Sequence, residues 1–117
     1  MTVKKHEEMD LAVAARWGVN ELPTLRGSEK QIAWAESLRK DALEWLRVAE
    51  KDAQSCVAKI ARRAKISEEE ASALLRQRVA SIIGAESAES IIDARLVICS
   101  GMLLMMSTQI VKELRGL

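Results

Sequence analysis

The side chains best suited to catalysis or metal binding are few and widely separated. Cys56 and Cys99 form no CxxC pair, and His6 is the single histidine. A zinc site needs about four closely spaced nitrogen or sulfur ligands, which these residues do not supply. His6 also lies near a chain end between Lys5 and Glu7, which is typical of a solvated side chain rather than a general base. We therefore expect no metal site and no cofactor, and cysteines that act as small buried hydrophobic residues.

Motifs of known catalytic sites are equally scarce. The sequence contains no GxSxG, P-loop, HExxH or Rossmann pattern. Three consecutive carboxylates, Glu68, Glu69 and Glu70, are a conceivable metal ligand set. In the first turn of a helix, however, their interaction with the helix dipole accounts for them. We expect a protein that is not an enzyme and has no catalytic residues.

A short basic cluster offers a different kind of chemistry. It consists of Lys59, Arg62, Arg63 and Lys65. The first three are spaced i, i+3 and i+4, so they share one face of a helix. They could contact a phosphate backbone, with the following helix as the recognition helix of a helix-turn-helix pair, or form a solvated helix end. The chain has 18 basic and 17 acidic side chains, so net charge does not favour nucleic acid. A small nucleic-acid-binding regulator is the alternative function.

Composition predicts the fold class. The 117 residues are 49% hydrophobic and 30% charged, with no Phe or Tyr. Good helix formers dominate, whereas a sheet would draw on aromatic and β-branched residues, so we expect one all-α domain over residues 1–117. Residues 1–10 lack the apolar core of a secretory signal, and the apolar run 96–106 is shorter than a bilayer span. We expect a cytoplasmic protein without a membrane partner.

Hydrophobic periodicity places the first helices. Residues 3–16 form an amphipathic helix that Gly18 ends, and residues 18–27 form a linker. Ser28 and Gln31 form a capping box that begins the strongest helix of the chain. Its apolar residues recur every three or four positions as far as residue 64, either as one long helix or with a break near residues 52–55.

The second half of the chain predicts two more helices. Ser67 and Glu70 form a second capping box opening a helix over 67–83, and Gly84 ends it. A final helix covers about 87–115, and its apolar segment 96–106 is either the most buried part of the core or the contact of a homodimer. Gly101 is expected where another helix approaches closely. The predicted architecture is a small bundle with a long central helix and a buried apolar C-terminal helix.

Two groups of large side chains are candidates for binding a partner. Trp34 and Trp45 are three helical turns apart and project nearly in line, either as core anchors, which we favour, or as an exposed pair. The methionines near the C-terminus fill the core or form an adaptable contact surface. The candidate partner-binding residues on these two helices are Lys40, Arg47, Lys51, Met102, Met105 and Met106.

Residues 22–35 carry a more specific pattern. They read Leu-Pro-x-Leu-x-Gly-Ser-x-Lys-Gln-x-x-Trp-Ala, and residues 92–95 read Ile-Asp-Ala-Arg. This combination resembles small proteins of bacteriophages, plasmids and other mobile elements with the pattern LPxLxGSxKQxxWA and a later IDxR. The resemblance covers residues 22–95, leaving an N-terminal helix and linker (1–21) and an apolar C-terminal end (96–117).

The resemblance implies a setting and a structural role. It implies that a polar brace joins the start of the long helix to the last helix, either to fix the fold or to bind. The residues of this brace are Ser28, Lys30, Gln31, Trp34, Asp93 and Arg95. It also implies a protein that binds and inhibits or modulates a host-defence complex in the cytoplasm of the host bacterium. Anti-CRISPR proteins are a prominent example of such inhibitors, so a CRISPR-Cas component is a candidate partner.

Overall fold

The chain folds into helices, as the composition predicts. A computed structural model describes residues 2–116, with the side chains of residues 2–7 and 50 outside that description. The described part contains six helices: α1 (Thr2–Arg16), α2 (Glu29–Val48), α3 (Glu50–Ala64), α4 (Glu68–Ile83), α5 (Ala88–Asp93) and α6 (Met102–Leu114). The all-α class is confirmed. None of these helices is long and apolar enough to cross a membrane.

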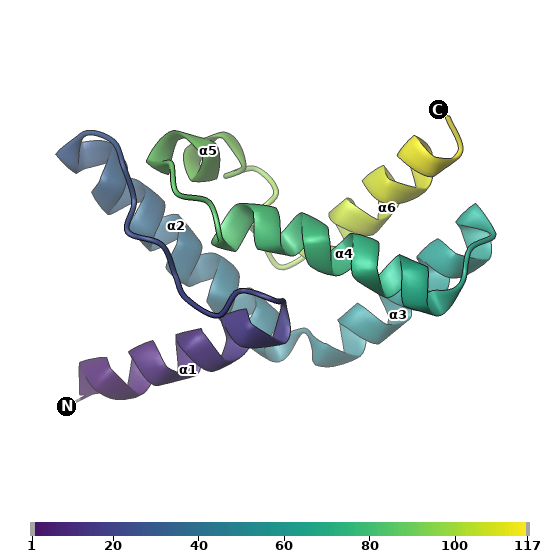
Figure 1. The fold of residues 1–117 in the computed structure, drawn as a ribbon, viewed down its shortest axis with the longest axis horizontal. Coiled ribbons are helices and arrows are strands. Elements are labelled where there is room, and N and C mark those ends of the chain that lie inside the picture. The colour runs from purple at the N-terminus through teal and green to yellow at the C-terminus, as the bar shows by residue number, and fades with distance from the viewer. Residues whose placement is uncertain (1, 117) are drawn as a thin grey trace.

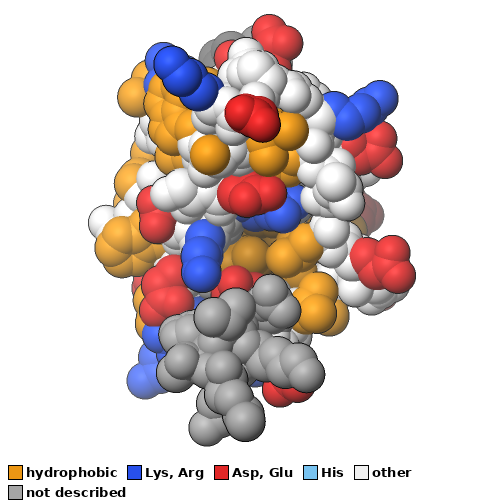
Figure 2. Space-filling view, turned by 90° about the vertical axis from the view of Figure 1, so that its left-hand side faces the viewer, with side chains coloured by type: hydrophobic (Ala, Val, Ile, Leu, Met, Phe, Trp, Pro, Cys, Tyr) orange, Lys and Arg blue, Asp and Glu red, His pale blue; other side chains and the backbone are white. Residues whose placement is uncertain are grey.

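Helix α4 runs through the middle of an elongated molecule of 44 × 28 × 21 Å (Figure 1). It contacts α2 and α5 toward one end, and α3 and α6 toward the other. The larger core lies among α1, α2, α3, α4 and α6, and a smaller one lies between α2, α5 and the linker. At the end formed by α1 and the start of α2, acidic and basic side chains are interspersed with hydrophobic ones (Figure 2).

Both predicted helix starts are capped by serine. The Ser28 hydroxyl accepts from the Gln31 amide at 3.2 Å, and the Gln31 side chain accepts from the Ser28 amide at 3.1 Å, which confirms the capping box. Ser67 supplies half of the second predicted pair, because its hydroxyl accepts from the Glu70 amide at 3.1 Å. Gly84 follows the last residue of α4, as expected. These ends depend on local bonds, which is why the sequence predicts them well.

The long helix breaks earlier than predicted. The break lies at Ala49, not within residues 52–55. The Ala49 amide donates to Leu46 O at 3.3 Å, a tighter turn than the α-helix, and its side chain is buried in the larger core. No Gly or Pro lies at this break, so packing between helices, not a local helix breaker, accounts for it. The bend lets α3 pack against α4 and α6 while α2 packs against α5 (Figure 1).

The predicted C-terminal helix over 87–115 is wrong as a single element. Helix α5 ends at Asp93, and residues 94–101 form turns before α6 begins. A straight helix could not bring α5 onto α2 and α6 onto α3, which is what the structure shows. Gly101 precedes α6, and a Cβ atom there would meet nothing within 4 Å. Gly101 is therefore not a point of close helix approach.

The apolar segment 96–106 divides between core and surface. Met102, Leu103 and Met106 are buried within this single chain, and the buried Ser107 hydroxyl donates to Leu104 O at 2.8 Å. By contrast, the side chain of Leu96 is 79% exposed. The segment therefore belongs mostly to the core of a single chain, but the exposed side chain of Leu96 is not covered by any part of the described chain.

Candidate protein-binding surface

Helix α2 carries a second apolar stripe beside the one that faces the core. We call it the outer stripe, and it comprises Trp34, Leu38, Asp41, Trp45 and Val48. Steps of four, three, four and three residues keep these positions on one helix face. Trp34 is 50% exposed, Trp45 40% and Val48 65%, whereas Leu38 is half-buried and packs against the smaller core. The favoured prediction that both tryptophans are core anchors is therefore wrong, because the core is filled by the neighbouring face of α2.

The Trp34 end of the outer stripe is where the two halves of the sequence pattern meet. The Arg95 guanidinium carbon lies 5.7 Å from the centroid of the Trp34 ring, within cation–π range. Arg95 Nη1 also donates to Ile92 O at 2.9 Å, which holds the guanidinium. Lys30 and Asp93 are exposed and form no hydrogen bond or ion pair in the described part of the chain. Of the proposed brace, the structure joins Trp34 to Arg95 and Ser28 to Gln31.

The linker before α2 is tied down on α5. The Arg26 amide donates to Glu86 O and the Ala88 amide donates to Arg26 O, both at 2.9 Å, and the Arg26 and Glu86 side chains pair at 3.2 Å. Leu25 is buried in the smaller core. Leu25 of the LPxLxGS pattern therefore has a structural role, and the backbone of Arg26 beside it fixes the linker to the start of α5.

A further bond ties the linker to α2. Arg39 Nη1 donates to Pro23 O at 2.8 Å. Partial burial lowers the pKa of Arg39 from its usual value, although Glu36 and Asp10 oppose that shift. This hydrogen bond joins two residues that are sixteen positions apart in the sequence, and it anchors the middle of α2 to the linker.

The Trp45 end of the outer stripe borders a small hollow of about 250 Å³. Its lining includes Trp45, Asp52, Gly101 and Leu104, so α2, α3 and the start of α6 all contribute. Leu104 is 55% exposed. Exposed apolar side chains therefore extend from the outer stripe onto the start of α6.

The predicted partner-binding residues are scattered. Met102 and Met106 are 1% exposed, so the prediction that they contact a partner is wrong, because their face of α6 packs on the core. Met105 is 39% exposed and lies 3.8 Å from the Cys99 sulfur. Lys40 and Arg47 are exposed, roughly a third of a turn around α2 from the outer stripe, and Lys51 is exposed on α3. Glu44 bonds the Arg47 guanidinium and thereby raises the pKa of Arg47.

The basic cluster lies at the end of α3. Arg62, Arg63 and Lys65 are exposed and Lys59 is half-buried, and a three-residue turn leads into α4. In a helix-turn-helix protein the N-terminal residues of the second helix contact base edges. Here that first turn presents three exposed glutamates, which would be repelled by phosphates.

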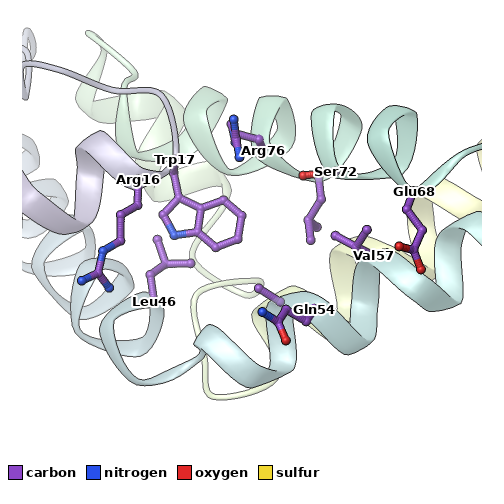
Figure 3. A pocket seen from close by; sticks show the side chains of 10 residues that line it. Arg16, Trp17, Leu46, Gln54, Val57, Glu68, Ser72 and Arg76 are labelled. Atoms are coloured by element: carbon purple, nitrogen blue, oxygen red, sulfur yellow. The ribbon is translucent and has the colours of Figure 1, made fainter.

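A cleft between α3 and α4 was not predicted from the sequence. It encloses about 650 Å³, with half-buried Trp17 at the end near α1 (Figure 3). Its charged lining residues are Arg16 and Arg76 together with Glu68. In the described residues no buried side-chain nitrogen or oxygen lacks a hydrogen-bond partner. The cleft therefore has no preformed buried polar group for a ligand.

No group of three His, Cys, Asp or Glu side chains in the described residues is placed to hold a metal ion. Cys56 is buried and Cys99 is half-buried, both as free thiols. The side chain of His6 lies outside the described part of the structure.

Comparison with known proteins adds no relative. No family model matches the chain, and neither the curated proteins nor the solved structures contain a match. The functional conclusion therefore depends on the surface of this molecule and on the sequence pattern of residues 22–95.

Proposed function

We propose that this protein acts by binding another protein through the outer stripe of α2 and the neighbouring exposed side chains of residues 94–104. The observation that carries the proposal is the exposure of Trp34 and Trp45 in line on one helix face. Tryptophan and arginine are enriched among the residues that dominate binding energy, and Arg95 flanks this face. Several large apolar side chains exposed on one face are typical of interaction sites.

The resemblance to small mobile-element proteins supports a particular setting for this binding. In that setting the partner is a host-defence complex in the bacterial cytoplasm, with a CRISPR-Cas component as the first candidate. The protein would then be a non-catalytic inhibitor or modulator, and an anti-CRISPR protein if that candidate is the partner.

Affinity capture from a bacterial lysate with defence systems expressed tests the proposal. Wild type is compared with Trp45→Ser and Val48→Glu, which alter the outer stripe, and with Gln77→Glu, an exposed change on α4. We expect one retained complex that both outer-stripe variants lose and Gln77→Glu keeps. The activity of that complex is then measured with and without the protein. If Trp45→Ser and Val48→Glu retained the complex as well as wild type does, the proposal would be contradicted.

The nucleic-acid alternative has one observation in its favour, which is the exposure of Arg62 and Arg63 without an ion pair in the described chain. Retention on random duplex DNA at low salt tests it, with a Lys59, Arg62 and Arg63 to alanine variant as the control. Tight binding that falls steeply with salt and disappears in this variant would replace the protein-binding proposal. We expect no such binding.

A further inference from the structure

The outer stripe has the spacing of a helix-pairing seam. From Trp34 to Val48 it extends for about 21 Å along α2, at 1.5 Å per residue. Its 4-3-4-3 steps are those of the a and d positions through which two helices interdigitate. A face of this length fits one amphipathic helix laid along it.

Asp41 is the one polar residue of the outer stripe and stands at its centre, three residues after Leu38 and four before Trp45. It is exposed and forms no hydrogen bond or ion pair in the described part of the chain. A helix laid over the stripe would remove water from this carboxylate. That desolvation is costly unless the arriving helix supplies a cation or a donor.

Asp41 also disfavours pairing of the outer stripe with the same stripe of a second copy. An isologous dimer places each residue of the interface against its symmetry equivalent or a reciprocal position. In a parallel pair Asp41 faces Asp41 of the second copy, and in an antiparallel pair centred on the stripe it does so again. Like charges in direct opposition at an interface are unfavourable, so the stripe is not suited to a second copy of this chain.

We propose that the outer stripe binds a single amphipathic helix of the partner protein, with apolar residues along its seam and a Lys or Arg opposite Asp41. This inference depends on the protein-binding function proposed above and specifies its partner. The charges at the two ends add direction. Arg95 lies beside Trp34, and Asp52 lines the hollow next to Trp45. The partner helix should therefore be acidic near Trp34, opposite the Arg95 cation, and basic near Trp45, opposite the Asp52 carboxylate.

Helical peptides provide a direct probe. Three stapled peptides of about 15 residues, long enough to match the stripe, carry leucine at the outer seam positions and Lys, Leu or Glu at the central one. Binding to the full-length protein is measured by fluorescence anisotropy of labelled peptide. We expect the Lys peptide to bind at least about ten-fold more tightly than either of the others. Equal binding of the Lys and Glu peptides, or tightest binding of the Leu peptide, would overturn the inference.

Charge reversal in the protein supplies the reciprocal test. Asp41→Lys should reverse the preference, so that the Glu peptide binds more tightly than the Lys peptide. Glu36→Lys makes the same charge change on the opposite side of α2 and should leave the order unchanged. Far-UV circular dichroism checks that both variants fold. An unreversed preference in a folded Asp41→Lys protein would contradict a contact at Asp41.

Two further outcomes distinguish a helical partner from protein binding in general. Failure of all three peptides to bind, while lysate capture still depends on Trp45 and Val48, would refute the helix partner and leave protein binding intact. Loss of the capture result would refute both. Sedimentation of wild type should show a monomer, and a dimer abolished by Val48→Glu would show that the occupant is a second copy instead.

Discussion

The Arg95 guanidinium carbon lies 5.7 Å from the centroid of the Trp34 ring, and this contact joins the start of α2 to the segment after α5. The two residues are far apart in the sequence, one in each half of the LPxLxGSxKQxxWA and IDxR pattern. Trp34 remains 50% exposed beneath the cation. The contact therefore both contributes to the fold and shapes the end of the outer stripe.

Removing this cation should weaken the fold slightly. Arg95→Ala is expected to lower the free energy of unfolding by about 0.5–1 kcal/mol, the usual range for a partly exposed cation–π pair. Arg95→Lys should retain part of that stability. Urea unfolding followed by circular dichroism measures the change, and Arg115→Ala, at an exposed arginine after α6, is the control. Equal effects at the two positions would show that the ring contact contributes nothing.

Gly27 should tolerate no side chain. Its φ of +151° is unfavourable for other residues, and a Cβ atom would lie 3.0 Å from the Gln31 side-chain oxygen and 3.2 Å from the Ala88 Cβ. Gly27→Ala is expected to cost about 1–3 kcal/mol, because it strains both the backbone and the cap of α2. Gly101→Ala is the matched control, since φ there is −98° and space is open. Thermal unfolding compares them, and similar melting temperatures would contradict the prediction.

Neighbouring methionines of α6 should differ sharply. Met106 is 1% exposed and Met105 39% exposed. Met106→Ala should therefore lose about 2–4 kcal/mol of unfolding free energy by leaving a cavity, whereas Met105→Ala should lose about 0.5 kcal/mol or less. Denaturant unfolding of the two variants measures the difference. Comparable losses would mean that α6 does not place Met106 in the core and Met105 at the surface.

The ion pair between Arg78 and Glu113 should make stability fall in acid. The hydrogen bond from Arg78 holds the pKa of Glu113 below its ordinary value of 4.5. The folded state therefore favours the carboxylate, and this stability is present above pH 4.5 and is lost as pH falls through the lowered pKa. Glu113→Gln should reduce the steepness of the acid limb of stability against pH.

Because the pair joins α4 to α6, Arg78→Gln should produce the same change as Glu113→Gln. The double variant should add little to either single change. Melting temperatures between pH 3 and 7 provide the measurement. Additive effects of the two substitutions would show that the side chains act independently.

Much of the local structure was predictable because short-range rules determine it. The serine caps of α2 and α4 and the stop at Gly84 follow from hydrogen bonds within three or four residues. The 4-3-4-3 spacing of the outer stripe is also present in the sequence. The spacing alone does not show that this face is exposed, because the hydrophobic side chains of an amphipathic helix ordinarily face the core.

The sequence by itself determined the helical class, the starts of α2 and α4, and the small number of groups able to do chemistry. Tertiary structure alone decided where α2 bends, where the C-terminal helix divides and which large side chains stay exposed. Ala49 and residues 94–99 contain neither Gly nor Pro, so the turns there reflect the packing of α3, α5 and α6 on their neighbours. The exposure of Trp34 and Trp45 follows from the same competition, because one face of α2 can be buried in the core and the adjacent one cannot.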